Sequence, residues 1–162
     1  MSLPSAQNGP ATRARLMERC QRLGAPACAI TASGHIAAVT PLAPELDNLM
    51  RSPPIVAAIS VCSVHGVGEL ATYELFPGAR LIVVPTPEGL AHQGRVGALL
   101  LSPGALDDPE FALLCAAAGV DASTARAALG PSARFDAFSV NLVAEALLSS
   151  SMVAFGFARI PF

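Results

Sequence analysis

The segment CSVHG, residues 62–66, places a cysteine and a histidine close enough in the chain to act together. If a helix runs through it, Cys62 and His65 stand at positions i and i+3, where their side chains can point the same way. Such a pair could contribute two metal ligands or a cysteine–histidine nucleophile. A closed zinc site takes about four ligands, however, and a catalytic one about three. His35 and His92 could complete a set only through folding, because their spacing along the chain supports no site.

A structural role is the simpler interpretation of the same segment. Cys62 has the character of a small core residue, and His65 is tolerated near a helix C-terminus, where a positive charge is favourable. We therefore predict no catalytic residues and no metal site. A small enzyme that uses Cys62 and His65 stays as the least favoured alternative. No glycine-rich phosphate-binding motif follows a predicted strand, and the sequence identifies no cofactor.

Polar residues that could serve a ligand pocket are few, because 52% of the chain is hydrophobic and 14% is charged. Small-molecule sites are typically apolar cavities with a few polar groups. The alternative is that these residues lie at the rim of a sheet or in solvent. The candidate ligand-binding residues are Tyr73, Arg80, His92 and Arg95, with Cys62 and His65 as further candidates.

Charge and cysteine content narrow the functional class. The net charge of −2 gives no electrostatic footprint for nucleic acid, so we predict no nucleic-acid partner. The N-terminus MSLPSAQNGP lacks the features of a secretory signal. The four cysteines form no CxxC or zinc-finger spacing, which favours reduced thiols and a cytoplasmic location.

The C-terminal part of the chain is unusually apolar. Residues 142–158 are nearly all apolar or small, but Glu145 interrupts them. A membrane helix needs about 20 predominantly apolar residues. We therefore predict no membrane span and a helix buried against a core or a partner.

The first half of the chain predicts helices around one hairpin. A helix is expected over residues 12–23, followed by two short strands in ACAITASGHIAAVTP that turn at Ser33–Gly34. PELDNLM predicts one or two helical turns. A further helix is expected from Pro53, with Ser52 as its N-cap and Gly66 near its end. A strand is the alternative there, because the segment is rich in β-branched residues.

The second half predicts three strands and then helices. ELATYELFPGARLIVVP is an alternating strand, a turn and a buried strand, and RVGALLLS is a third strand. Asp108 should cap a helix that stops at Gly119, and Asp121 should open another that runs to Gly130. The last helix is expected over residues 135–158.

These elements predict an α+β fold. It has a five- or six-stranded antiparallel sheet with flanking helices and a long C-terminal helix. We expect a flexible lead over residues 1–11, an α/β core over 12–104 and a C-terminal helical extension over 105–162.

Two phrases carry a family resemblance, ELFPGARLIVVP and EFALLCAAAGVDASTARAAL. With the order of elements, they resemble GAF/PAS-like sensory domains over about residues 12–150. More specifically, they resemble the N-terminal sensor regions of bacterial signalling proteins associated with histidine kinase or HD-type phosphohydrolase modules. The resemblance implies a ligand pocket on one face of the sheet. The resemblance implies no catalytic residue, since such domains bind a ligand and relay a conformational change.

The leading hypothesis is a non-enzymatic sensory or regulatory domain of bacterial signal transduction. It would bind a small molecule, form a homodimer through its C-terminal helix, or do both, and relay a signal as a shift between conformations. The alternative is a protein-interaction scaffold without a small ligand. The sequence identifies neither the ligand nor the downstream module, and the finish at FARIPF is compatible with a fragment of a longer protein.

Overall fold

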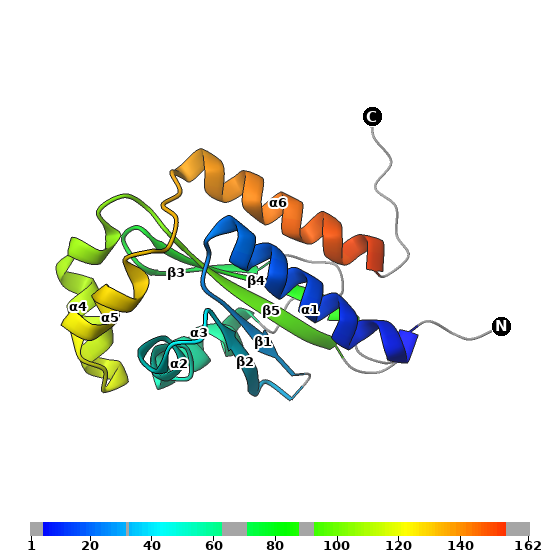
Figure 1. Ribbon diagram of the computed structural model, residues 1–162, viewed down its shortest axis with the longest axis horizontal. Helices are drawn as coiled ribbons and strands as arrows, with labels where there is room; N and C mark the ends of the chain where they lie inside the picture. Colours follow the sequence, from blue (N-terminus) through cyan, green and yellow to red (C-terminus); the bar gives the residue numbers. More distant parts are fainter. Residues whose placement is uncertain (1–4, 32, 63–70, 88–92, 155–162) are drawn as a thin grey trace.

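The chain folds around one five-stranded antiparallel sheet, as predicted (Figure 1). The computed structural model describes residues 5–31, 33–62, 71–87 and 93–154. The strand order is β2-β1-β5-β4-β3. The elements are α1 (Ser5–Leu23), β1 (Ala27–Ile30), β2 (Ile36–Thr40), α2 (Pro44–Met50), α3 (Pro53–Cys62), β3 (Ala71–Phe76), β4 (Ala79–Pro87), β5 (Gln93–Leu101), a 3-10 turn (Ala105–Asp107), α4 (Pro109–Ala118), α5 (Ala122–Leu129) and α6 (Ala137–Ala154).

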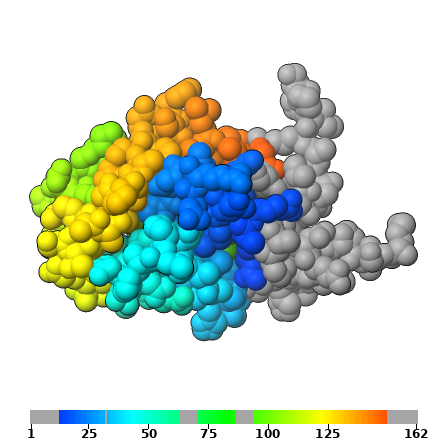
Figure 2. Space-filling model, in the orientation of Figure 1, coloured from blue at the N-terminus to red at the C-terminus, as the bar shows by residue number. Residues whose placement is uncertain are grey.

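Helices cover both faces of the sheet, which gives a three-layer arrangement. Helices α1 and α6 lie against each other and pack on one face, over β1, β4 and β5 (Figures 1 and 2). Helices α2 and α3 pack on the other face, and α4 and α5 extend that layer at one end of the sheet. We call these the α1/α6 face and the α2–α5 face. Both sides of the central strands are therefore buried.

Alternation along β4 shows how one strand serves both layers. Leu81 and Val83 belong to the core under α2–α5, whereas Ile82 and Val84 belong to the core under α1 and α6. Successive strand residues point to opposite faces, so a strand buried on both faces becomes a continuous apolar run. The sequence LIVV is such a run.

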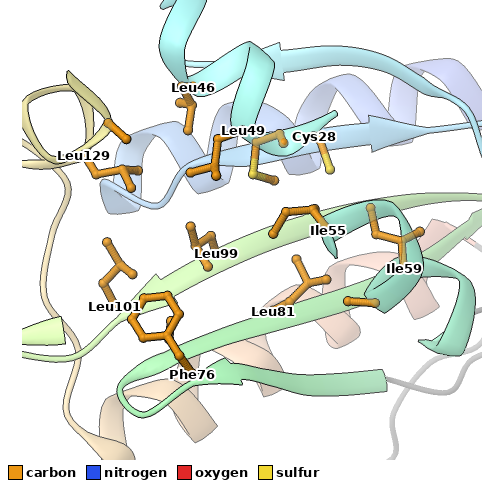
Figure 3. Close-up of a cluster of buried hydrophobic side chains, with 14 of the residues drawn as sticks. Cys28, Leu46, Leu49, Ile55, Ile59, Phe76, Leu81, Leu99, Leu101 and Leu129 are labelled. Carbon is orange, nitrogen blue, oxygen red and sulfur yellow. The ribbon is translucent and has the colours of Figure 1, made fainter. Parts of the chain in front are cut away.

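The core of the α2–α5 face contains most of the largest fully buried side chains (Figure 3). Phe76 at the end of β3 lies against Phe111 of α4, with ring centroids 5.8 Å apart. Arg126 of α5 stacks over the Phe111 ring at 5.7 Å and donates to the carbonyl oxygen of Leu106 at 3.1 Å. Helices α4 and α5 thus share one core with the sheet.

The predicted helix ends of α4 and α5 are confirmed. The Asp108 carboxylate accepts a hydrogen bond from the Glu110 N–H at 2.8 Å, and Gly119 ends α4 with φ of 71°. Asp121 accepts from the Thr124 N–H at 2.9 Å at the start of α5. Each aspartate satisfies an amide that the helix itself cannot pair.

Residues 53–62 form a helix, α3, and not the alternative strand. Ile55, Ile59 and Cys62 are buried on its inner side. Ser52 precedes α3 as predicted, and its carbonyl accepts from the Val56 N–H at 3.0 Å. Its hydroxyl, however, donates to the carbonyl oxygen of Leu49 in the last turn of α2. The predicted terminating residue, Gly66, lies outside the described residues.

Two helix boundaries differ from the sequence-based expectation. Helix α1 begins at Ser5, before the expected start at Thr12. Helix α6 begins at Ala137 because Phe135 is extended, with its N–H bonded to the carbonyl of Leu101 at 2.8 Å. Asp136 then caps α6 by accepting from the Ser139 N–H at 2.7 Å. Helical periodicity did not reveal this backbone pairing.

No single helix among the described residues is long and apolar enough to cross a membrane. Helices α4 and α5 meet the length and composition criteria only when taken together, and they are bent by 110°.

Candidate functional site

A groove of about 510 Å³ lies between α6 and the β3–β4 hairpin on the α1/α6 face. Its volume is in the range of small-molecule sites, which span about 300–1,000 Å³. Its lining combines small and apolar side chains with a few polar and charged groups. The lining residues are Thr72, Glu74, Gly78, Ala79, Arg80, Leu100, Ser102, Phe135, Ala137, Val140, Asn141, Ala144 and Glu145.

The groove exists because the two helices of this face do not cover the outer strand equally. Helices α1 and α6 pack chiefly on β1, β4 and β5, while β3 forms the edge of the sheet. Thr72 and Glu74 of β3 are consequently exposed and face the side of α6. Ala144 of α6 is buried at the base of the groove.

Two opposite charges stand side by side on the strand floor of the groove. Glu74 of β3 and Arg80 of β4 are cross-strand partners in the antiparallel register. The side chains of directly opposed residues start about 5 Å apart on the same face. Within the part of the chain that the structure describes, however, Glu74 and Arg80 form no ion pair. Arg80 is half-buried and Glu74 is exposed, so both charged groups remain accessible from the groove.

Helix α6 supplies the opposite wall. Val140 and Ala144 present an apolar strip, while Asn141 and Glu145 place an amide and a carboxylate at the same rim. Glu145 already has an interaction within the chain. The groove therefore offers polar groups from both the strands and α6, beside an apolar strip on α6.

The tight turn at Gly78 fixes one end of the groove. Gly78 has φ of 90°, a backbone conformation that residues other than glycine rarely adopt. Its carbonyl accepts from the Ser102 N–H at 2.7 Å, and a Cβ at this position would collide with the Ser102 hydroxyl. The phrase FPGA thus holds the hairpin against the segment that follows β5.

The structure divides the predicted ligand-binding residues between the two faces: Arg80 lies on the α1/α6 face, and Cys62, Tyr73 and Arg95 lie on the α2–α5 face. Arg80 lines the groove. Tyr73, 39% exposed, is the cross-strand partner of Leu81 and so lies on the α2–α5 face. Arg95 pairs with Ile30 and lies on that same face. His65 and His92 fall outside the described residues.

Cys62 is buried in the core of the α2–α5 face. Burial raises the pKa of its thiol above the usual value, and the positive charge of Arg95 offsets part of that rise. A thiol with a raised pKa holds little thiolate, which is the nucleophilic form. Among the described residues, no three histidine, cysteine, aspartate or glutamate side chains are grouped as metal ligands.

A second hollow of about 310 Å³ lies between β2 and α2 and is lined mainly by apolar side chains. Its one carboxylate, Asp47, is already paired with the Arg51 guanidinium at 3.0 Å. This hollow offers fewer polar groups to a ligand than the groove beside α6.

Sequence reasoning identified Arg80 in the groove but missed Glu74, Asn141 and Glu145. The alternation in ELATYELF does place Thr72 and Glu74 on one side of a strand. The position of α6 over that side depends on tertiary packing, which no local pattern reveals.

Comparisons of the chain with protein-family models, with curated proteins and with solved structures found no match. The α+β sheet with flanking helices is compatible with a GAF/PAS-like domain.

Proposed function

We propose that this protein is a non-enzymatic sensory or regulatory domain that binds a small molecule in the groove beside α6. One observation carries the proposal: a cavity of suitable size, with a mixed polar and apolar lining, is walled by a helix that also closes the core. We further propose the GAF/PAS-like sensory class, a bacterial signalling context and a cytoplasmic location, consistent with the sequence resemblance and the fold.

The position of α6 supports the relay step. Val143 and Leu147 anchor α6 to the sheet, whereas Asn141 and Glu145 border the groove. A ligand that contacts both the hairpin and α6 would favour one placement of the helix over others. A ligand shifts such an equilibrium only by its difference in affinity for the two placements.

The test uses 8-anilinonaphthalene-1-sulfonate, an amphiphilic anion whose fluorescence rises in apolar sites. We expect saturable binding and slower amide hydrogen exchange in α6. The variant Ala137→Trp fills the groove from an exposed position on its lining and should weaken binding at least about tenfold. The control Ala117→Trp, at an exposed position on α4, should bind as the parent does. Equal binding by all three proteins would refute a site in the groove.

A specific observation also favours a protein-interaction function, the second candidate. Phe138 and Leu142 are 72% and 57% exposed, and they stand four residues apart on the outer side of α6. Side chains at this spacing share one helix face. They could form the seam of a homodimer, as predicted for the C-terminal helix.

Sedimentation equilibrium tests that second candidate. The homodimer predicts twice the monomer mass of 16.5 kDa for the parent chain and the monomer mass for the double variant Phe138→Ser/Leu142→Ser. A control with Leu113→Ser, which removes an exposed leucine from α4, should keep the dimer. A monomeric parent chain at 100 μM would refute the dimer.

A further inference from the structure

The floor of the groove beside α6 holds two opposite charges that neither pair with each other nor, among the described residues, with any other group. These are Arg80 and Glu74, directly opposed on β4 and β3. Both lie in the lining of the cavity together with Leu100, Phe135 and Val140. The groove thus has a charged part with both signs and an apolar part.

A ligand with one charge would satisfy only one of these two residues, and its binding would depend on the apolar part of the groove. A carboxylate bound to Arg80 would stand close to the Glu74 carboxylate, and an ammonium bound to Glu74 would stand close to the Arg80 guanidinium. Like charges a few ångströms apart repel, and the repulsion grows as water is excluded. A ligand that carries both charges on neighbouring atoms would satisfy Arg80 and Glu74 together and avoid both repulsions.

Geometry favours a short separation between the ligand charges. Cross-strand neighbours begin about 5 Å apart, so their charged ends can converge on groups attached to one carbon atom. A guanidinium can donate two parallel hydrogen bonds to a carboxylate, and a glutamate can accept from an ammonium. Phe135, Leu100 and Val140 then leave an apolar surface for the remainder of the ligand.

Resting on the function proposed above, we infer that the groove binds a small zwitterion of the amino-acid class with an apolar side chain. Its carboxylate binds Arg80, its ammonium binds Glu74, and its side chain packs against Phe135, Leu100 and Val140. Binding involves no covalent step.

The test is a titration followed by ¹H–¹⁵N NMR, with three probes of one carbon skeleton. They are L-leucine, 4-methylpentanoate, which lacks the ammonium, and 3-methylbutylamine, which lacks the carboxylate. We expect L-leucine to shift amide signals of β3, β4 and α6 and to bind at least about tenfold more tightly than either truncated probe. Equal binding by 4-methylpentanoate would overturn the zwitterion in favour of a simple carboxylate.

Two variants give a crossed signature that general destabilisation would not produce. Arg80→Met should weaken the binding of L-leucine about tenfold or more. Binding of 3-methylbutylamine should be unchanged or tighter, because the substitution removes a positive charge that repels it. Glu74→Gln should weaken the binding of L-leucine by a similar factor, while the binding of 4-methylpentanoate should be unchanged or tighter. The controls Arg22→Met and Glu18→Gln remove an exposed ion pair on α1 and should change nothing. Equal losses for all three probes in Arg80→Met would contradict the assignment.

Failure of this inference can be distinguished from failure of the proposed function. If the anilinonaphthalene probe binds the groove and Ala137→Trp weakens it, but L-leucine at 50 mM causes no shifts, the groove is a ligand site and the amino-acid assignment is wrong. If neither probe perturbs the groove, both proposals fall.

Discussion

The two faces of the sheet are built from the same strands, but one is closed by its helices and the other carries a groove. The α2–α5 face is sealed by large apolar side chains from four helices (Figure 3). Phe76 and Phe111 are in contact at one end of this core. The α1/α6 face is sealed over the central strands and opens over β3 into a groove with charged walls. Of the two faces, the α1/α6 face thus carries the groove with the Glu74 and Arg80 charges.

Neighbouring residues of β4 make the contrast sharp. Leu81 is fully buried on the α2–α5 face, whereas the preceding residue, Arg80, lines the groove on the other. Because strand residues alternate, a single position along the chain separates a stability role from a proposed binding role.

The largest effect is expected from truncation of the sealed face. Leu81→Ala should lower the free energy of unfolding by about 2–5 kcal/mol, because it removes apolar contacts and leaves a cavity. Arg80→Ala should change it by less than about 0.5 kcal/mol, as is usual for substitutions away from the core. Urea unfolding followed by circular dichroism measures both. Similar losses for the two variants would break the contrast between the faces.

The reactivity of two buried thiols, Cys20 and Cys28, compares how well each of the two cores is closed. Burial raises the pKa of Cys20 to about 11 and that of Cys28 to about 12. Cys20 lies in the core under α1 and α6, and Cys28 in the core of the α2–α5 face. At pH 8 we expect both to be alkylated by iodoacetamide at least about a hundredfold more slowly than an unfolded-state cysteine, since the thiolate reacts.

Mass spectrometry of peptides over a time course measures these alkylation rates. The lower pKa of Cys20 accounts for labelling about tenfold faster than that of Cys28. A larger difference would show that the α1/α6 face opens more often. Unfolding in urea should abolish the protection of both thiols.

Gly78 tests how firmly the end of the groove is fixed. Gly78→Ala should destabilise the fold by about 1–3 kcal/mol, because it combines a positive φ with a collision against Ser102. Gly104→Ala is the matched control: its φ is 81°, but no atom lies within 4 Å of the added Cβ. The difference between the two variants, measured by urea unfolding, reports the collision. Equal losses would mean that the close approach to Ser102 contributes nothing.

The smallest expected effect is a change in the pH dependence of stability when the carboxylate caps of α5 and α6 are removed. The Thr124 hydroxyl and N–H lower the pKa of Asp121, and the Ser139 N–H and hydroxyl lower that of Asp136. A carboxyl with a lowered folded-state pKa stabilises the fold above its unfolded pKa of about 3.9, and this contribution is lost as pH falls through the folded value.

Unfolding midpoints between pH 7 and pH 2.5 test these caps. Asp121→Asn and Asp136→Asn should each flatten the decline in stability below about pH 4, where the parent loses the two contributions. Asp107→Asn, on the 3-10 turn, is the control and should keep the parent profile. A parent-like profile in both cap variants would show that neither cap is linked to protonation.

Local signals in the sequence were sufficient for most of the fold. The Asp108 and Asp121 caps, the glycine turns and the run LIVV each depend on backbone geometry or burial within a few residues. The α+β class with five antiparallel strands followed from them. The early start of α6 expected from the sequence was wrong because Phe135 pairs with Leu101, a contact between distant segments.

The groove was largely beyond sequence reasoning for a related reason. Arg80 was identified because a charged residue at a strand start is conspicuous in an apolar chain. Glu74 gains its significance from the β3–β4 register, and Asn141 from the placement of α6 over β3. Tyr73 and Arg95 looked like equivalent pocket residues, but the register assigns them to the other face.

The strand order has a consequence for how the chain reaches its native state. The sheet consists of two local units, the β1–β2 hairpin and the β3–β4–β5 meander, which meet where β1 pairs with β5. Closing a longer loop costs more conformational entropy, so the pairs within each unit should form before the β1–β5 junction. Helix α1 contacts β1, β4 and β5 and therefore bridges that junction. Docking of the N-terminal helix and docking of the two half-sheets should accordingly be one cooperative event late in folding.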